Sequence, residues 1–115
     1  MYEIRLQSDP QKTVERLAKK ARSRFLTINN VLAQISQDPY ADTELLQDPL
    51  LSGFRRARAE GDRIVFQLCE ECRRDSHLME KRQCVDCSTF PDNTIMVFDI
   101  DTRSRIMYEK KHKRR

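Results

Sequence analysis

The sequence is poor in glycine, has no tryptophan and contains no long hydrophobic run. Its 115 residues include 2 glycines and 4 prolines, which excludes collagen-like and low-complexity proteins. No stretch approaches the roughly 18 consecutive apolar residues that a transmembrane helix needs. The segment from Met1 to Gln7 has an acid at position 3 and no apolar core, so no secretory signal is expected. These absences predict a soluble, cytoplasmic protein with no membrane partner.

Charge is abundant where apolar residues are scarce. Lys and Arg number 22 against 18 Asp and Glu, which gives a net charge of +4, and 35% of all residues are charged. Hydrophobic residues make up 38%, below the usual share of roughly 45–50% in soluble domains. The chain length fits one domain. We therefore expect a single small core and a modest preference for anionic partners.

The N-terminal part predicts a strand followed by helix. Residues 2–7 alternate apolar and polar side chains, as in a half-buried strand. Asp9 and Pro10 are typical of an N-cap and a first helical residue. Apolar residues then recur at steps of three and four over roughly residues 10–37, and Asp38-Pro39 ends this stripe. Residues 27–30 are its weakest stretch, so the pattern allows one long helix or a bent pair.

The C-terminal half predicts an antiparallel meander. Strands are expected at residues 54–59, 63–68 and 94–101, with a tight turn at 60–62 and a short fourth strand at 106–108. Residues 40–53 are interpreted as a connection with at most one helical turn. The fold class is α+β: an N-terminal strand, a helix or helical hairpin, then the meander, with one helical layer on one sheet. One domain is expected over residues 1–109, with a basic tail at 110–115.

All four cysteines lie in two C-x-x-C pairs, Cys69/Cys72 and Cys84/Cys87, separated by eleven residues. Two such turns can complete a tetrahedral four-thiolate zinc site, which has no open position for chemistry and is therefore structural. Disulfides, a redox dithiol or an iron–sulfur site are the alternatives, and His77 is interpreted as a surface residue. Residues 73–82 hold six charges in ten positions, so zinc is expected to fold residues 69–87 as an inserted loop.

Strand parity places arginines on one face of the predicted sheet. If Met96, Phe98 and Ile100 face the helix, the opposite face carries Ile95, Val97, Asp99 and Asp101. The same parity directs four arginines to that face: Arg56, Arg58, Arg63 and Arg103. They either pair with the two aspartates on a solvated surface or bind phosphate, which suits the guanidinium fork. Arginine is dense in these strands and lysine is absent, which favours phosphate binding.

Three motifs resemble the RelE/ParE toxin superfamily. Residues 56–66 (RARAEGDRIVF) are similar to its arginine-rich hairpin, and residues 50–54 (LLSGF) are similar to the segment before that hairpin. Ile100-Asp-Thr-Arg103, followed by Tyr108, resembles the closing motif. Together with the order of elements, the resemblance covers about 90 residues and excludes the cysteine loop and the tail.

The resemblance implies the toxin of a type II toxin–antitoxin pair, held inactive by an acidic antitoxin protein. RelE-like members enter the ribosome and cleave mRNA by attack of a 2′-hydroxyl on the adjacent phosphate. The family pattern assigns Arg56 and Arg58 to holding the RNA backbone, and Arg63 and Arg103 to stabilising the transition-state charge. It assigns Tyr108 to base stacking or proton transfer, and Arg105 competes with Arg103.

The sequence also departs from the family pattern. Asp62 replaces a tyrosine, the spacing from Arg103 to Tyr108 is one residue longer than usual, and the cysteine pairs are not a general family feature. The general base stays open among Glu60, Asp99 and Asp101. Two other functions remain as alternatives: a non-enzymatic, ParE-like gyrase inhibitor, and a zinc-ribbon module that binds nucleic acid.

Overall fold

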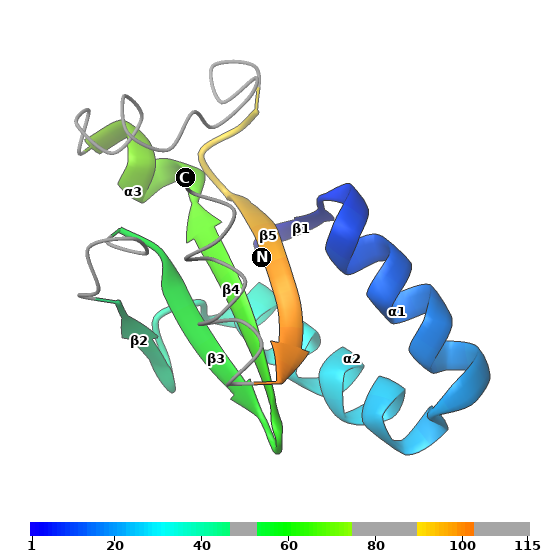
Figure 1. The fold of residues 1–115 in the computed structure, drawn as a ribbon. Coiled ribbons are helices and arrows are strands. Elements are labelled where there is room, and N and C mark those ends of the chain that lie inside the picture. Colours follow the sequence, from blue (N-terminus) through cyan, green and yellow to red (C-terminus); the bar gives the residue numbers. More distant parts are fainter. Residues whose placement is uncertain (47–52, 75–89, 103–115) are drawn as a thin grey trace, which may run out of the picture.

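The computed structural model describes residues 1–46, 53–74 and 90–102, which form a five-stranded sheet covered on one face by two helices (Figure 1). The strands are β1 (Glu3–Leu6), β2 (Thr43–Leu45), β3 (Arg55–Ala59), β4 (Asp62–Leu68) and β5 (Thr94–Thr102). The helices are α1 (Ser8–Lys20), α2 (Arg22–Gln37) and the short α3 (Cys69–Arg74). The α+β class and the single helical layer are confirmed, and the helical layer is a hairpin.

The strand order in the sheet is β1-β5-β4-β3-β2. The meander β2-β3-β4-β5 is antiparallel, and β1 pairs in parallel with β5. Tyr2 and Ser36 tie the start of β1 to the end of α2: the Tyr2 amide donates to the Ser36 carbonyl, and the Ser36 hydroxyl donates to the Tyr2 carbonyl at 2.6 Å. The helical hairpin is therefore fixed to the sheet at both of its ends.

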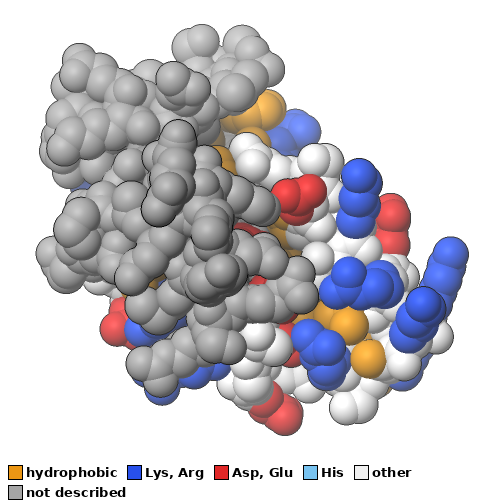
Figure 2. Space-filling view, in the orientation of Figure 1, with side chains coloured by type: hydrophobic (Ala, Val, Ile, Leu, Met, Phe, Trp, Pro, Cys, Tyr) orange, Lys and Arg blue, Asp and Glu red, His pale blue; other side chains and the backbone are white. Residues whose placement is uncertain are grey.

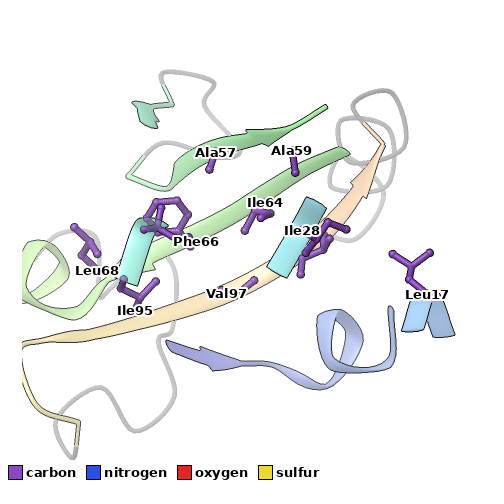
Figure 3. Packing of buried hydrophobic residues seen from close by; sticks show 11 residues of the cluster. Leu17, Ile28, Ala57, Ala59, Ile64, Phe66, Leu68, Ile95 and Val97 are labelled. Carbon is purple, nitrogen blue, oxygen red and sulfur yellow. The ribbon is translucent and has the colours of Figure 1, made fainter. Parts of the chain in front are cut away.

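The main core lies between the helices and the sheet (Figure 3). Leu17 of α1 and Ile28 of α2 pack against apolar side chains of the three central strands. The buried members on the strands are Ala57, Ala59, Ile64, Phe66, Leu68, Ile95, Val97 and Ile100. The apolar stripe of the sequence thus covers a sheet, which is the usual role of an amphipathic helix.

The helix boundaries correct two expectations. Helix α1 begins at Ser8 with Gln7 as its N-cap, so Pro10 is its third residue, a first-turn position where the missing N–H costs nothing. The two helices meet at Ala21, whose φ of −145° is not helical, and residues 27–30 are continuous helix. Neither Gly nor Pro lies at this break.

The expected faces of β5 were partly wrong, and a β-bulge is the reason. Phe66 pairs with Val97 and Val65 with Asp99, so Phe98 is an extra residue with no Cα partner on β4. A bulge shifts the alternation of side chains by one position. Ile95 and Val97 therefore face the helices together with Ile100, while Phe98 packs with Val65 and Phe54 on the opposite face. Strand β2 was missed because its three residues carry no alternation.

Candidate nucleic-acid interface

The sheet face opposite the helices carries an arginine face, which we define as Arg56 and Arg58 of β3 and Arg63 of β4. Their neighbours Ala57, Ala59 and Ile64 enter the core, so alternation directs the arginines to the other side. Arg58 pairs directly with Arg63 across the two strands. Like charges at directly opposed positions destabilise a sheet, so this arrangement favours an anionic partner.

The β3–β4 turn positions Arg63. Its guanidinium donates to the carbonyl oxygens of Glu60 and Asp62, at 2.9 and 3.0 Å. Glu60 has a left-handed φ of 58°, and Asp62 accepts two hydrogen bonds from Arg24 of α2, at 2.7 and 3.1 Å. Asp62 is 3% exposed, and its carboxylate joins the turn to the helical layer. The residue that departs from the family pattern therefore has a structural partner of its own.

Glu44 of β2 is a carboxylate on the arginine face that sequence reasoning did not find. It accepts a hydrogen bond from Arg56 at 2.6 Å and lies 3.8 Å from Arg58. The hydrogen bond from Arg56 lowers the pKa of Glu44 below its ordinary value. Its side chain is 51% exposed, whereas that of Arg56 is 18% exposed. No sequence signal marked it, since β2 itself was not predicted.

Arg55 belongs to the opposite side of the sheet. It pairs with the core residue Phe66 and forms a bidentate ion pair with Glu71 of α3, at 2.9 and 2.8 Å. Its guanidinium also lies 4.8 Å from the ring centre of Tyr40. Glu70, the neighbour of Glu71, accepts hydrogen bonds from the hydroxyls of Tyr2 and Tyr40. Helix α3 is thereby anchored to three separate parts of the chain.

The first cysteine pair lies in this anchored helix. Cys69 and Cys72 are one helical turn apart, on one face of α3, and are 1% and 0% exposed. Their spacing and burial fit half of a four-thiolate site. Cys84 and Cys87 lie outside the described residues, and the described ranges alone hold no cluster of three or more His, Cys, Asp or Glu side chains suited to a metal.

Several predicted positions lie outside the described ranges: Arg103, Arg105, Tyr108, His77, the strand at 106–108 and the basic tail. The structure brings Arg56, Arg58 and Arg63 together, and the register places Asp101 opposite Arg63 and Asp99 opposite Val65. Both aspartates therefore share the face of the arginines, as predicted. None of the helices in the described part of the chain is long and apolar enough to cross a membrane.

A second basic surface lies on the helical hairpin. Figure 2 shows Lys and Arg side chains gathered over the region that α1 occupies in Figure 1. The exposed basic residues of α1 and of the start of α2 are Lys12, Arg16, Lys19, Lys20 and Arg22. This surface provides arginines and lysines that belong to another face of the molecule, which makes them useful controls.

Comparison with known proteins identifies the fold. No protein-family model matches the chain, and no curated protein matches it significantly. Among solved structures, the YoeB/ParE toxin from Agrobacterium tumefaciens has a TM-score of 0.62 at 11% identity, covering 88% of this chain and 98% of that one. The YoeB–YefM toxin–antitoxin complex from Staphylococcus aureus gives 0.60 at 14% identity, covering 90% of this chain and 98% of that one.

The toxin–antitoxin complex RelBE2 from Mycobacterium tuberculosis gives a TM-score of 0.58 at 16% identity and covers 89% of this chain and 98% of that one. At such identities the likeness concerns the fold. The chain has the fold of the RelE/ParE toxins, as its motifs predicted, and it matches these structures over nearly their whole length.

Proposed function

We propose that the protein is the toxin of a type II toxin–antitoxin pair and cleaves mRNA on the ribosome. The observation that supports this is the arginine face: Arg56, Arg58 and Arg63 lie together on the side of a RelE/ParE-type sheet opposite the helices. Fork-shaped guanidinium groups suit phosphate oxygens and keep their charge at all physiological pH values. Their role is therefore electrostatic, and the proton acceptor must be another group.

In the proposed reaction, a ribose 2′-oxygen attacks the adjacent phosphorus and the bond to the 5′-oxygen breaks. The products are a 2′,3′-cyclic phosphate and a 5′-hydroxyl. Glu44 takes the proton of the 2′-hydroxyl, because this carboxylate lies on the arginine face in contact with both Arg56 and Arg58. Arg63, with Arg103, stabilises the charge on the phosphorane, and Tyr108 or solvent supplies the proton for the leaving oxygen.

An acidic antitoxin protein is the proposed partner. Two of the similar structures are complexes of a toxin with its antitoxin. A cationic sheet face attracts an acidic segment of such a partner. Co-purification of a neighbour-encoded acidic protein, with release by Arg56→Glu, tests this. The antitoxin proposal is contradicted if overexpression of the chain does not arrest growth and no acidic protein is encoded beside it.

We also propose one structural zinc ion held by Cys69, Cys72, Cys84 and Cys87. The support is the buried pair on α3, one turn apart and fixed by the Glu71–Arg55 ion pair. Zinc thiolate coordination supplies folding free energy and leaves no open position for catalysis. The metal therefore stabilises residues 69–87 and takes no part in the cleavage reaction.

Controlled expression followed by mapping of mRNA ends tests the main proposal. Wild-type chain is expected to arrest growth and to produce codon-phased cuts that require ribosomes. Arg63→Ala should lower the cutting rate by about 10²–10³, the cost of removing one preorganised charge. Arg16→Ala, on the exposed face of α1, is the matched control and should change little. Growth arrest that persists in Arg63→Ala without cuts favours a ParE-like binding toxin.

A further inference from the structure

Two side chains of helix α2 contact the β3–β4 turn. Arg24 donates to both carboxylate oxygens of Asp62, from Nε at 3.1 Å and from Nη2 at 2.7 Å. One helical turn further along, the hydroxyl of Thr27 lies 3.4 Å from a carboxylate oxygen of Glu60. Glu60 and Asp62 flank Gly61, so the turn meets the same helix on both sides of its glycine.

Asp62 and Arg63 are neighbours in β4 whose side chains lie on opposite sides of the sheet. Asp62 is 3% exposed and reaches the helical layer, whereas Arg63 belongs to the arginine face. One terminal nitrogen of Arg63, Nη1, donates to the carbonyl oxygens of Glu60 and Asp62. Because both acceptors are backbone groups of the turn, a shift of the turn moves the guanidinium with it.

The backbone of this turn needs support from outside. Glu60 has a left-handed φ of 58°, which residues other than glycine seldom adopt. Such a conformation persists where surrounding contacts hold it. A bidentate pair of guanidinium and carboxylate fixes the orientation of its two partners as well as their distance. Arg24 and Asp62 form such a pair, in which the carboxylate side chain is 5% exposed and the arginine side chain is 44% exposed.

We propose that the Arg24–Asp62 pair positions Arg63 for the phosphate whose charge it stabilises. The inference rests on the proposed function and adds two positioning residues, which act through the turn and touch no RNA. A misplacement of about 1 Å, caused by a change far from the chemistry, can cost 10²-fold in rate. Binding should respond less than rate, because Arg56 and Arg58 still hold the RNA backbone.

Cleavage of mRNA on programmed ribosomes by full-length variants tests the assignment. Asp62→Asn keeps the shape of the side chain but breaks the bidentate pair, and it leaves no buried charge behind. It should lower the maximal rate about 10–10²-fold, while the half-saturating concentration stays within about twofold of wild type. Arg24→Met should do the same. Arg22→Met is the matched control on the same helix, since the Arg22 guanidinium lies over the ring of Phe25, and it should cut at the wild-type rate.

A double-mutant cycle separates positioning from a general structural role. In an Arg63→Ala background, Asp62→Asn or Arg24→Met should cost less than about twofold in rate, because the group that the pair positions is absent. A loss that adds fully to that of Arg63→Ala overturns the proposal. Wild-type rates in both Asp62→Asn and Arg24→Met, alongside a large loss in Arg63→Ala, also overturn it, while the proposed nuclease function stands. If wild type makes no cuts, the nuclease function fails and this assignment fails with it.

Discussion

Arg55 and Glu71 form a bidentate ion pair whose side chains are only 13% and 10% exposed. The pair joins β3 to α3, the helix that carries the first two cysteines. By strand parity alone, Arg55 would serve as a neutral control for the arginine face. The ion pair gives it a different role, because removing one partner of a buried pair leaves the other charge without compensation.

Arg55→Ala is therefore expected to lower the free energy of unfolding by about 3 kcal/mol. The double variant Arg55→Met/Glu71→Leu should recover most of that loss, since it removes both charges and keeps the apolar contacts. Urea denaturation measures both. Arg16→Ala, exposed on α1, should stay within about 0.5 kcal/mol of wild type. Equal stability of Arg55→Ala and wild type would mean that this ion pair does not anchor α3.

Metal removal should unfold the cysteine loop and leave the sheet largely intact. Purified protein should contain about one zinc per chain, and a strong chelator should lower its thermal midpoint. Cys72→Ser should lose the zinc and resemble the chelated protein, whereas Ser23→Ala, remote in α2, should keep it. The zinc assignment would be contradicted if the metal-free protein had the same thermal midpoint as the untreated protein, or if the purified chain contained disulfide bridges.

Stability should decrease in alkaline solution because of two tyrosines. Burial and the hydrogen bond to Glu70 raise the pKa of Tyr40 above its ordinary value, and the same causes act on Tyr2. In the unfolded chain a tyrosine loses its proton near pH 10. Above that pH the unfolded state binds fewer protons than the folded state, so the free energy of unfolding falls as pH rises.

Urea titrations between pH 7 and 11 measure this slope. Tyr40→Phe should flatten it, because phenylalanine has no proton to lose. If the free energy of unfolding falls equally steeply with pH in Tyr40→Phe and wild type, Tyr40 does not contribute to the pH dependence.

Glu44→Gln should slow RNA cleavage by about 10²–10⁴, the usual contribution of a general base. RNA binding should not weaken, since the amide removes a negative charge from the arginine face. Because Arg56 lowers the pKa of Glu44, the wild-type rate should stay flat through neutral pH and fall only in acid. A rate that falls already near pH 6–7 would assign the proton transfer to a group other than Glu44. Glu15→Gln on α1 is the matched control.

Much of the sheet was predictable because its signals are local. Residues 56–59 alternate between arginine and alanine, residues 62–68 are rich in β-branched and aromatic side chains, and Ala57 and Ile64 face the core as expected. The β5 bulge at Phe98 could not be read from the sequence, because Ile95, Val97 and Phe98 are all apolar and fit either face. Register with β4 decides which of them is buried against the helices.

Of the candidate site, only the arginines could be predicted from the sequence. The arginines follow from parity, but Glu44 belongs to a three-residue strand that pairing with β3 creates. Likewise, Gln67 looks like an ordinary exposed strand residue in the sequence, whereas it is 1% exposed in the structure. The break at Ala21 also has no local signal. For Glu44, pairing between two segments of the chain determines the outcome.

The parallel pairing of β1 with β5 has a consequence for how the protein is made. Glu3 pairs with Thr94, so the first strand to leave the ribosome waits for a partner that is synthesised near the end of the described chain. Such distant contacts delay folding. The sheet is complete only after β5 has been synthesised. For the proposed toxin, the complete fold would therefore form only when nearly all of the described residues have been synthesised.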